Sequence, residues 1–548
     1  MAERKRWHLW SGFWATSLGT LASRVLGLAR DVATAALLGL GEAGVMDAFV
    51  IAFRVPNLLR RIFGEGALAA SFLPVFTRQA DESPHRGWQL LSVLFAWLAM
   101  LLVALVLVGE IGCAWWWLRA GGGSADAALV GLLAAMLPYL VLIFLAAHAA
   151  AALQSLLEFR VPAVAPMILN VCWLAAAWLV APRFEPDKLA QAYVIAVAVL
   201  ISGVLQFGVQ WAALRRLGFR FDYDWHASRD AFWLVVRTTL PVALGLAVTQ
   251  LNTLTDSLIA WILSAPEGAA HRIAWLGGNV AYPMQTGAAA AIYYGERFYQ
   301  LPVGILGVAI ATVIYPLLSR HAARGAAAEL ARDLSLGLRL VTFTALPASV
   351  GMMLVAEPAT RLLFERGAFT AYDAQRAAAM IACYASGVWA YCAIPVLVRG
   401  FYAVGHANAP AKLGLVAVAV NLALNLTLIW PLAERGLAVS TAVAAGVQVL
   451  LLATTFSSGV HRLPWAELAT TFGKCMLATL AMTSAVLAVR FGYPLQFDSS
   501  RAQLALQLLL MIGGGAASYL AAARLLHIPE LGLLLRRPRL GEAIDRDD

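Results

Sequence analysis

Apolar residues fill long runs of this chain, and short polar connections separate the runs. A helix that crosses a membrane needs about 20 mostly apolar residues. About fourteen segments of that kind can be placed in the sequence, which predicts an all-α protein that crosses a membrane many times. The segments lie near residues 9–38, 44–76, 87–117, 127–156, 162–181, 189–214, 231–263, 288–318, 334–356, 374–403, 410–431, 437–460, 468–490 and 503–526.

The overall composition agrees with this pattern and excludes a soluble domain. Of the 548 residues, 61% are hydrophobic and 13% are charged, against about 45–50% and about 25% in soluble domains. The five cysteines stand singly in apolar segments without metal-ligand spacing, so we predict small buried hydrophobes and no metal site. The net charge of +9 comes from Lys and Arg at segment ends, which indicates membrane topology rather than nucleic-acid binding.

Basic connections indicate which side of the membrane each terminus faces. An even number of spans places both termini on one side, and that side carries basic connections at 214–230 and 319–333 as well as a basic tail. The connections at 38–46 and 264–279 are poorer in Lys and Arg. The positive-inside rule therefore predicts cytoplasmic termini, with the first apolar segment retained as a helix and not cleaved as a signal peptide.

Two short stretches recur in the second half of the chain. "FLPVFTRQA" (72–80) resembles "IYPLLSRHA" (314–322), and "LLEFRVPAVAP" (156–166) weakly resembles "VGHANAPA" (404–411). An internal repeat of this kind predicts two pseudo-symmetric lobes of six helices each. Chance similarity between apolar sequences is the alternative. The predicted parts are an N-terminal lobe at 1–222, a C-terminal lobe at 223–463, two extra helices at 464–530 and a cytoplasmic tail at 531–548.

Charged residues interrupt the second apolar segment, although a charge at the centre of a bilayer costs roughly 3 kcal/mol on insertion scales. In an ideal helix Asp47, Arg54 and Arg61 share a stripe, and Glu65 returns to it, whereas Arg60 falls outside. Such residues are expected to face a water-filled cavity and to pair with one another. Salt bridges that hold helices together, or basic side chains that reach toward water from helix ends, are the alternatives.

Further arginines lie in the first and eighth segments. Arg24 shares an ideal helix face with Asp31, and Arg30 lies about 120° away. The eighth segment contains Glu296 and Arg297 within "YYGERFYQLP" (293–302), where tyrosines suit the wall of a polar cavity. Arginine holds phosphate oxygens bidentately, so these residues predict an anionic substrate. The chain has no G-x-x-x-x-G-K-[ST] motif, which argues against transport powered by its own ATP hydrolysis.

Oxygen-bearing side chains in apolar segments suggest a second kind of site. Asp256 and the Asn421/Asn425 pair, four residues apart, are candidate ligands of a monovalent cation. Hydrogen bonding between helices is the simpler interpretation.

Five longer stretches together resemble one known family. They are "SRVLGLARD" (23–31), "DAFVIAFRVPNLLRRIFGEGA" (47–67), "FLPVF" (72–76), "RVPAVAPMILN" (160–170) and "YYGERFYQLPVGILGVAIAT" (293–312). The chain resembles the MurJ/MviN family of lipid II flippases along nearly its whole length. The resemblance implies the fold of the multidrug/oligosaccharidyl-lipid/polysaccharide exporter superfamily.

The resemblance also implies roles for individual residues. Family arginines that engage the diphosphate map onto Arg24, Arg30, Arg60 and Arg297, and this favours Arg60 over Arg61, with a kink at Pro56 as the reason. Essential acidic residues map onto Asp47 and Glu65, and Glu296 is a supporting acid of the same cavity. Two features depart from the family. Residues 264–290 form a longer connection, and Asn425 stands where some relatives have an aspartate of a sodium site.

The expected function is therefore translocation of lipid II, the undecaprenyl-diphosphate-linked disaccharide-pentapeptide, to the periplasmic leaflet of the bacterial inner membrane. Alternating access would need no covalent chemistry and no cofactor, with the membrane potential or a monovalent cation as candidate driving force. Membrane lipids and the cell-wall synthesis machinery are candidate partners. The run "GGGAAS" (513–518) fits either a groove for the polyprenyl tail or a close helix contact. The alternatives are another exporter of the same fold, for drugs or polysaccharide-linked lipids, a membrane glycosyltransferase or a scaffold.

Overall fold

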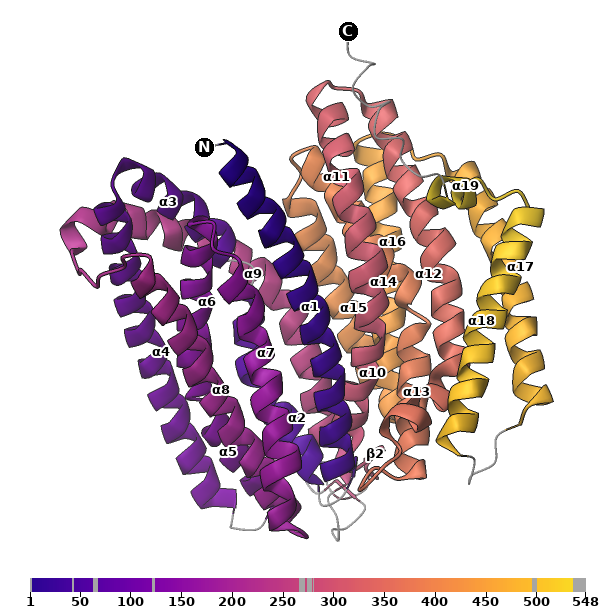
Figure 1. Cartoon of the computed structure of the whole chain (residues 1–548). Coiled ribbons are helices and arrows are strands. Elements are labelled where there is room, and N and C mark those ends of the chain that lie inside the picture. Colours follow the sequence, from indigo (N-terminus) through magenta and orange to yellow (C-terminus); the bar gives the residue numbers. More distant parts are fainter. Residues whose placement is uncertain are drawn as a thin grey trace. The chain divides into compact units, whose positions relative to one another are not determined.

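The computed structural model describes residues 2–41, 44–62, 68–120, 124–265, 272–273, 278, 280–494 and 500–535. Nearly all of these residues are helical (Figure 1). In chain order the elements are α1 (Ala2–Leu38), α2 (Val45–Leu59), α3 (Leu68–Glu82), α4 (Pro84–Ala120), α5 (Ala125–Met136), α6 (Tyr139–Ser155), α7 (Arg160–Ala175), η3 (Ala176–Val180), η4 (Ala181–Phe184), α8 (Lys188–Arg216), α9 (Trp225–Ile262), β1 (Ser264–Ala265), β2 (Met284–Gln285), α10 (Ala288–Pro302), η6 (Val303–Gly307), α11 (Val308–Ala323), α12 (Ala327–Phe364), α13 (Ala371–Ala385), α14 (Val388–Ala403), α15 (Asn408–Leu432), α16 (Glu434–Gly459), α17 (Trp465–Gly492), α18 (Arg501–Leu525) and α19 (Pro529–Leu535).

Each apolar segment predicted from the sequence coincides with helix, which confirms the all-α fold class. Within the described residues, eleven helical stretches are long and apolar enough to cross a membrane, so the expected number of fourteen is not confirmed. In the segment expected at 44–76, α2 ends at Leu59, residues 60–62 are π-helical and α3 begins at Leu68, while residues 63–67 lie outside the described residues. The chain is thus a multi-pass membrane protein.

The chain divides into two compact units. Unit 1 contains residues 1–290 and 366–373, and unit 2 contains residues 291–365 and 374–548. This division sorts helices by their contacts, whereas the lobes predicted at 1–222 and 223–463 rest on internal similarity, so those boundaries stay a prediction. Helix α9, which the repeat assigns to the second lobe, packs against α3 and α4 in unit 1.

Aromatic side chains form the core of unit 1. Phe72, Phe76, Phe95 and Phe219 belong to one buried cluster between α3, α4, α6 and the end of α8. His148 on α6 lies inside this cluster, with its ring centroid 4.4 Å from that of Phe72. Among the described residues neither nitrogen of that buried ring has a hydrogen-bond partner, so the histidine acts as a packing residue there.

Small and aliphatic residues form the core of unit 2. One cluster joins α11, α12, α14 and α16, and a second joins α12 to the C-terminal helices α17 and α18, which lie side by side in Figure 1. A Cβ at Gly515 on α18 would lie 2.8 Å from a methyl group of Val486, whereas nothing approaches Gly513 or Gly514 within 4 Å. One glycine of "GGGAAS" is therefore a close helix contact, and the tail groove stays a prediction.

The local geometry is alike at one of the two repeated stretches, but other helix ends of this chain share it, so the internal repeat stays a prediction. After α6, Leu157 has φ 63°, and the N–H of Glu158 donates to the carbonyl of Leu153 at 2.9 Å. After α14, Gly405 has φ 77°, and the next N–H donates to the carbonyl five residues earlier, also at 2.9 Å. Both helices thus end with the same left-handed capping motif. The following helix has proline as its third residue in both cases, at Pro162 and Pro410.

Candidate substrate-binding residues

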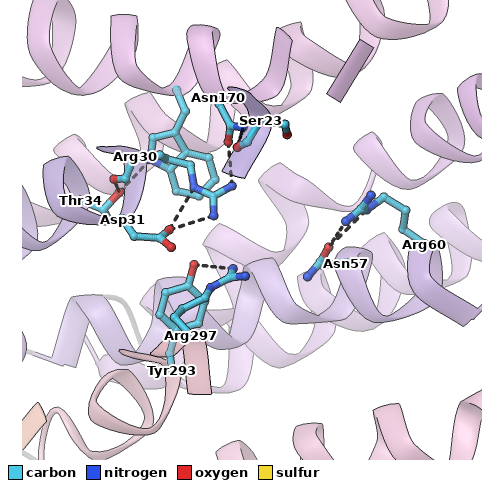
Figure 2. Close-up of polar contacts among 10 residues, drawn as sticks. Ser23, Arg30, Asp31, Thr34, Asn57, Arg60, Asn170, Tyr293 and Arg297 are labelled. Atoms are coloured by element: carbon cyan, nitrogen blue, oxygen red, sulfur yellow. Dashed lines mark hydrogen bonds and ion pairs between the residues drawn. The ribbon is translucent and has the colours of Figure 1, made fainter. Parts of the chain in front are cut away.

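Arg30 on α1 belongs to a buried polar network in unit 1. Its Nη2 and Nε donate to Oδ1 of Asp31 at 2.8 and 3.1 Å, and its Nη1 donates to Oδ1 of Asn170 on α7 at 3.2 Å (Figure 2). The three bonds use three of the five guanidinium N–H groups, which leaves two for another acceptor. The adjacent carboxylate and the amide therefore orient the charge of Arg30 without using all of its donors.

Aromatic rings complete the surroundings of Arg30. The guanidinium carbon lies 4.8 Å from the ring centroid of Trp173 and 5.9 Å from that of Phe53, which is within cation–π range. The indole of Trp173 donates to Thr34 Oγ1 at 2.8 Å, and that hydroxyl donates to the carbonyl of Arg30 at 2.9 Å. Side chains of α1, α2 and α7 thus fix the position of this guanidinium.

The contacts of Asp31 differ from the helical-wheel expectation. The sequence places Asp31 on the face of Arg24, but the structure shows it bonded to its neighbour Arg30, because a long flexible side chain can turn toward an adjacent residue. Arg24 is exposed on α1. The two candidate arginines of α1 therefore have different environments, because Arg30 is buried and hydrogen-bonded whereas Arg24 is exposed.

Arg60 follows the last residue of α2 and is half-buried. Its Nη2 and Nε donate to Oδ1 of Asn57 at 2.9 and 3.2 Å (Figure 2). Residues 60–62 are π-helical, and a π-turn changes the angular position of the residues that follow it. The stripe predicted for Asp47, Arg54 and Arg61 assumes an ideal α-helix, and residues 60–62 do not form one. Glu65 lies outside the described residues.

Arg54 and Asp47, also on α2, are buried in unit 1. Arg54 Nη1 donates to the carbonyl of Thr253 on α9 at 3.2 Å, which supports a structural role. Asp47 accepts from the backbone N–H groups of Gly287 and Ala290 at 2.6 and 2.7 Å. These groups lie at the start of α10, so the carboxylate of Asp47 caps that helix N-terminus.

Arg297 on α10 belongs to unit 2 and contacts a tyrosine one turn earlier. Its Nη2 donates to the hydroxyl of Tyr293 at 2.8 Å, and its guanidinium carbon lies 4.7 Å from the ring centroid (Figure 2). Glu296, the residue before Arg297 in the sequence, is buried. The π-helical turn η6 follows within six residues, and such turns are frequent at functional sites.

The candidate cation ligands lie in both units. Asp256 on α9 is buried in unit 1. In unit 2 the Asn425 amide donates to Asn421 Oδ1 at 3.1 Å, and the Asn421 amide donates to Thr441 Oγ1 on α16 at 3.2 Å. The bond to Thr441 joins α15 to α16 and supports the interpretation of helix–helix hydrogen bonding, whereas the bond between the asparagines lies within α15. Cation binding stays a prediction. Within the part of the chain that the structure describes, no group of three or more His, Cys, Asp or Glu side chains suits a metal ion.

Sequence reasoning missed the residues that position the arginines. Asn170, Trp173 and Asn57 were not singled out, although Asn170 ends the quoted stretch "RVPAVAPMILN" and stands in an otherwise apolar helix. A lone amide in such a helix was the available signal. The aromatic partner gave no signal of its own, because tryptophan is common in this chain, with 18 residues.

Solved structures share the fold of this chain. The fold is shared with a structure described as "Lipid II flippase MurJ, inward closed conformation", with a TM-score of 0.71 and 21% identity over 93% of this chain and 99% of that one. It is also shared with an inward-facing multidrug resistance MATE family transporter of the MOP superfamily, with a TM-score of 0.60 and 13% identity over 80% and 95% of the two chains. The chain therefore has the same fold as these two transporters.

Sequence comparison then gives the family. The family model described as "Lipid II flippase MurJ" matches residues 35–499. The "Probable lipid II flippase MurJ" of Vibrio cholerae is 33% identical over 93% of this chain and 94% of its own length. The "Lipid II flippase MurJ" of Burkholderia cenocepacia is 30% identical over 79% and 81%. The chain belongs to the lipid II flippase MurJ family.

Proposed function

We propose that this protein carries lipid II from the cytoplasmic to the periplasmic leaflet of the bacterial inner membrane, with both of its termini in the cytoplasm. The observation that carries the proposal is the Arg30 network, a buried guanidinium that is held in place and keeps two N–H donors. A diphosphate is the part of lipid II that such donors recognise best, because charge-assisted bonds from arginine to phosphate are strong and directional. Family membership supplies the identity of the lipid.

Each of the arginines Arg24, Arg30, Arg60 and Arg297 is assigned to the diphosphate at some stage of the transport cycle. Transport proceeds by alternating access, without covalent chemistry or a resident cofactor. The membrane potential acts on the cationic residues, since moving one charge through 100 mV is worth about 2.3 kcal/mol. A monovalent cation is the second candidate driving force, held either by Asp256 in unit 1 or by the Asn421/Asn425 pair in unit 2. The cell-wall synthesis machinery is the proposed protein partner.

Complementation of a bacterium depleted of its own lipid II flippase tests the proposal. Wild-type protein should restore growth and the appearance of lipid II in the outer leaflet. Arg30→Ala should abolish both at normal protein level, because the oriented charge is lost. Arg215→Ala is the matched control, since Arg215 is an exposed arginine at the end of α8. Full growth with Arg30→Ala would contradict the assigned role of Arg30.

The nearest rival is an exporter of drugs or polysaccharide-linked lipids, since the fold is shared with MATE transporters. The same depletion strain separates the two functions, because such an exporter would not restore peptidoglycan synthesis. Failure of the wild-type protein to support growth, despite correct membrane insertion, would favour the rival.

A further inference from the structure

A pocket of about 240 Å³ lies in unit 2 between the end of α12, the end of α17 and the first turns of α18. Its lining includes three charged side chains, one amide and two large apolar side chains, namely Glu357, Arg361, Arg490, Gln507, Phe491 and Met511. None of the arginines assigned to lipid II is among these residues. The pocket is smaller than the roughly 300–1,000 Å³ of typical ligand sites, so it suits a compact polar group.

Opposite charges meet at the outer part of this pocket. Arg490 Nη2 lies 2.8 Å from Glu357 Oε2, and both side chains are about two-fifths exposed, at 44% and 41%. An ion pair with this exposure contributes little to stability, because water screens both charges. A ligand with its own positive and negative groups can therefore replace the pair at small cost.

The inner part of the pocket is polar and buried. Arg361 is 9% exposed, and its Nε donates to Glu365 Oε2 at 2.8 Å, one turn further along α12. Gln507 is 3% exposed, and its amide donates to the carbonyl of Tyr493 at 2.8 Å. These bonds hold a guanidinium and an amide among the residues that line the pocket.

The surface beside the pocket is apolar. Phe491 is 77% exposed at the end of α17, and Leu506, Leu509 and Leu510 are exposed on α18. An exposed apolar surface next to a charged pocket at helix ends matches an amphiphile that lies along the helices with its head group in the pocket. Under the predicted topology this end of the helices is at the periplasmic surface.

We propose that this pocket binds the head group of a zwitterionic phospholipid that carries a primary ammonium group, with its acyl chains along α17 and α18. Arg361 and Arg490 hold the phosphate, and Glu357 accepts from the ammonium. Arginine suits phosphate oxygens because of its planar set of donors. The carboxylate of Glu357 disfavours a purely anionic lipid, because it would lie next to the negative head group. The proposal uses none of the arginines assigned to lipid II.

Lipid retention by the purified full-length chain tests the proposal. The protein in detergent is titrated with phosphatidylethanolamine, phosphatidylcholine or phosphatidylglycerol, and bound lipid is counted by native mass spectrometry. We expect phosphatidylethanolamine to bind about tenfold more tightly than the other two, a difference of about 1.4 kcal/mol. Arg490→Gln should reduce that binding by about tenfold, while Arg501→Gln, at an exposed arginine on the same end of α18, should leave it unchanged.

Glu357→Gln gives the sharper result, because a merely structural role would not change lipid preference. The variant should bind phosphatidylethanolamine more weakly and phosphatidylglycerol more tightly than the wild type does. The ratio of the affinity for phosphatidylethanolamine to that for phosphatidylglycerol should therefore fall by about tenfold or more. An unchanged ratio, or equal lipid binding by the Arg490 and Arg501 variants, would overturn the proposal. Displacement of the lipid by an equal concentration of glycerophosphoethanolamine would also overturn it, because a free head group would then suffice.

Discussion

The cap that Asp47 places on α10 leads to a quantitative prediction. Asp47→Asn keeps one carbonyl oxygen but puts an NH2 group against the second backbone N–H. Of the two bonds at 2.6 and 2.7 Å, one is lost and the other is no longer charge-assisted. Hydrogen bonds to charged groups contribute about 1.5–3 kcal/mol, and an unsatisfied buried donor costs about 1–3 kcal/mol. We expect Asp47→Asn to lower the free energy of unfolding by about 2 kcal/mol.

Thermal unfolding of the purified protein in detergent measures this effect. A loss of about 2 kcal/mol should lower Tm by about 2–3 °C, since 1 kcal/mol shifts Tm by about 2–4 °C in domains of about 150–250 residues and by less in larger proteins. Asp126→Asn is the matched control. Asp126 is also an acid in the first turn of a helix, but it is exposed and accepts only a 3.2 Å bond from Trp261. Its replacement should cost less than about 0.5 kcal/mol. Equal Tm values for the two variants would refute the capping interpretation.

Three further substitutions test packing and positioning. Asn170→Ala should lower lipid II transport at normal protein level. The guanidinium of Arg30 then loses the hydrogen-bond acceptor 3.2 Å away that helps to orient it. Complementation and lipid II export measure this effect. Gly515→Val should lower Tm by the equivalent of about 1–3 kcal/mol, because its Cβ position is 2.8 Å from a methyl group, whereas Gly514→Val, in open space, should not. Tyr293→Phe should reduce transport only a few-fold, because the hydroxyl bond to the arginine one turn later is lost while the ring contact stays.

Each of these predictions has an outcome that contradicts it. Wild-type transport by Asn170→Ala would show that the amide does not position the guanidinium. A Gly514 variant as unstable as the Gly515 variant would remove the distinction between the two faces of α18. Complete loss of transport in Tyr293→Phe would mean that the hydroxyl does more than orient its neighbour.

The positions of the helices could be predicted from the sequence because they depend on local information. An apolar run of sufficient length forms a helix in a membrane whatever surrounds it, since its backbone groups must bond within the segment. The ends of the second apolar segment were harder to predict. Residues 60–62 are π-helical, and hydropathy alone does not distinguish a π-helical turn from a continuing α-helix.

The partners of the charged residues depend on tertiary structure and could not be predicted in the same way. Asn170 is 140 residues from Arg30, and only the packing of α7 on α1 brings them together. The donors that bond Asp47 are backbone N–H groups, which have no side-chain identity for a sequence pattern to show. The acidic character of position 47 was visible, but its function as a helix cap was not.

The ring of Trp173 offers a spectroscopic view of transport. It is 1% exposed, stacks on the Arg30 guanidinium and holds the Thr34 hydroxyl. If a passing anion draws the cation away from the indole, the electric field at that ring changes while bulk water stays excluded. Fluorine-labelled tryptophan, with the Trp173→Phe spectrum used to assign the resonance, would then report turnover from inside the bilayer without any added chromophore.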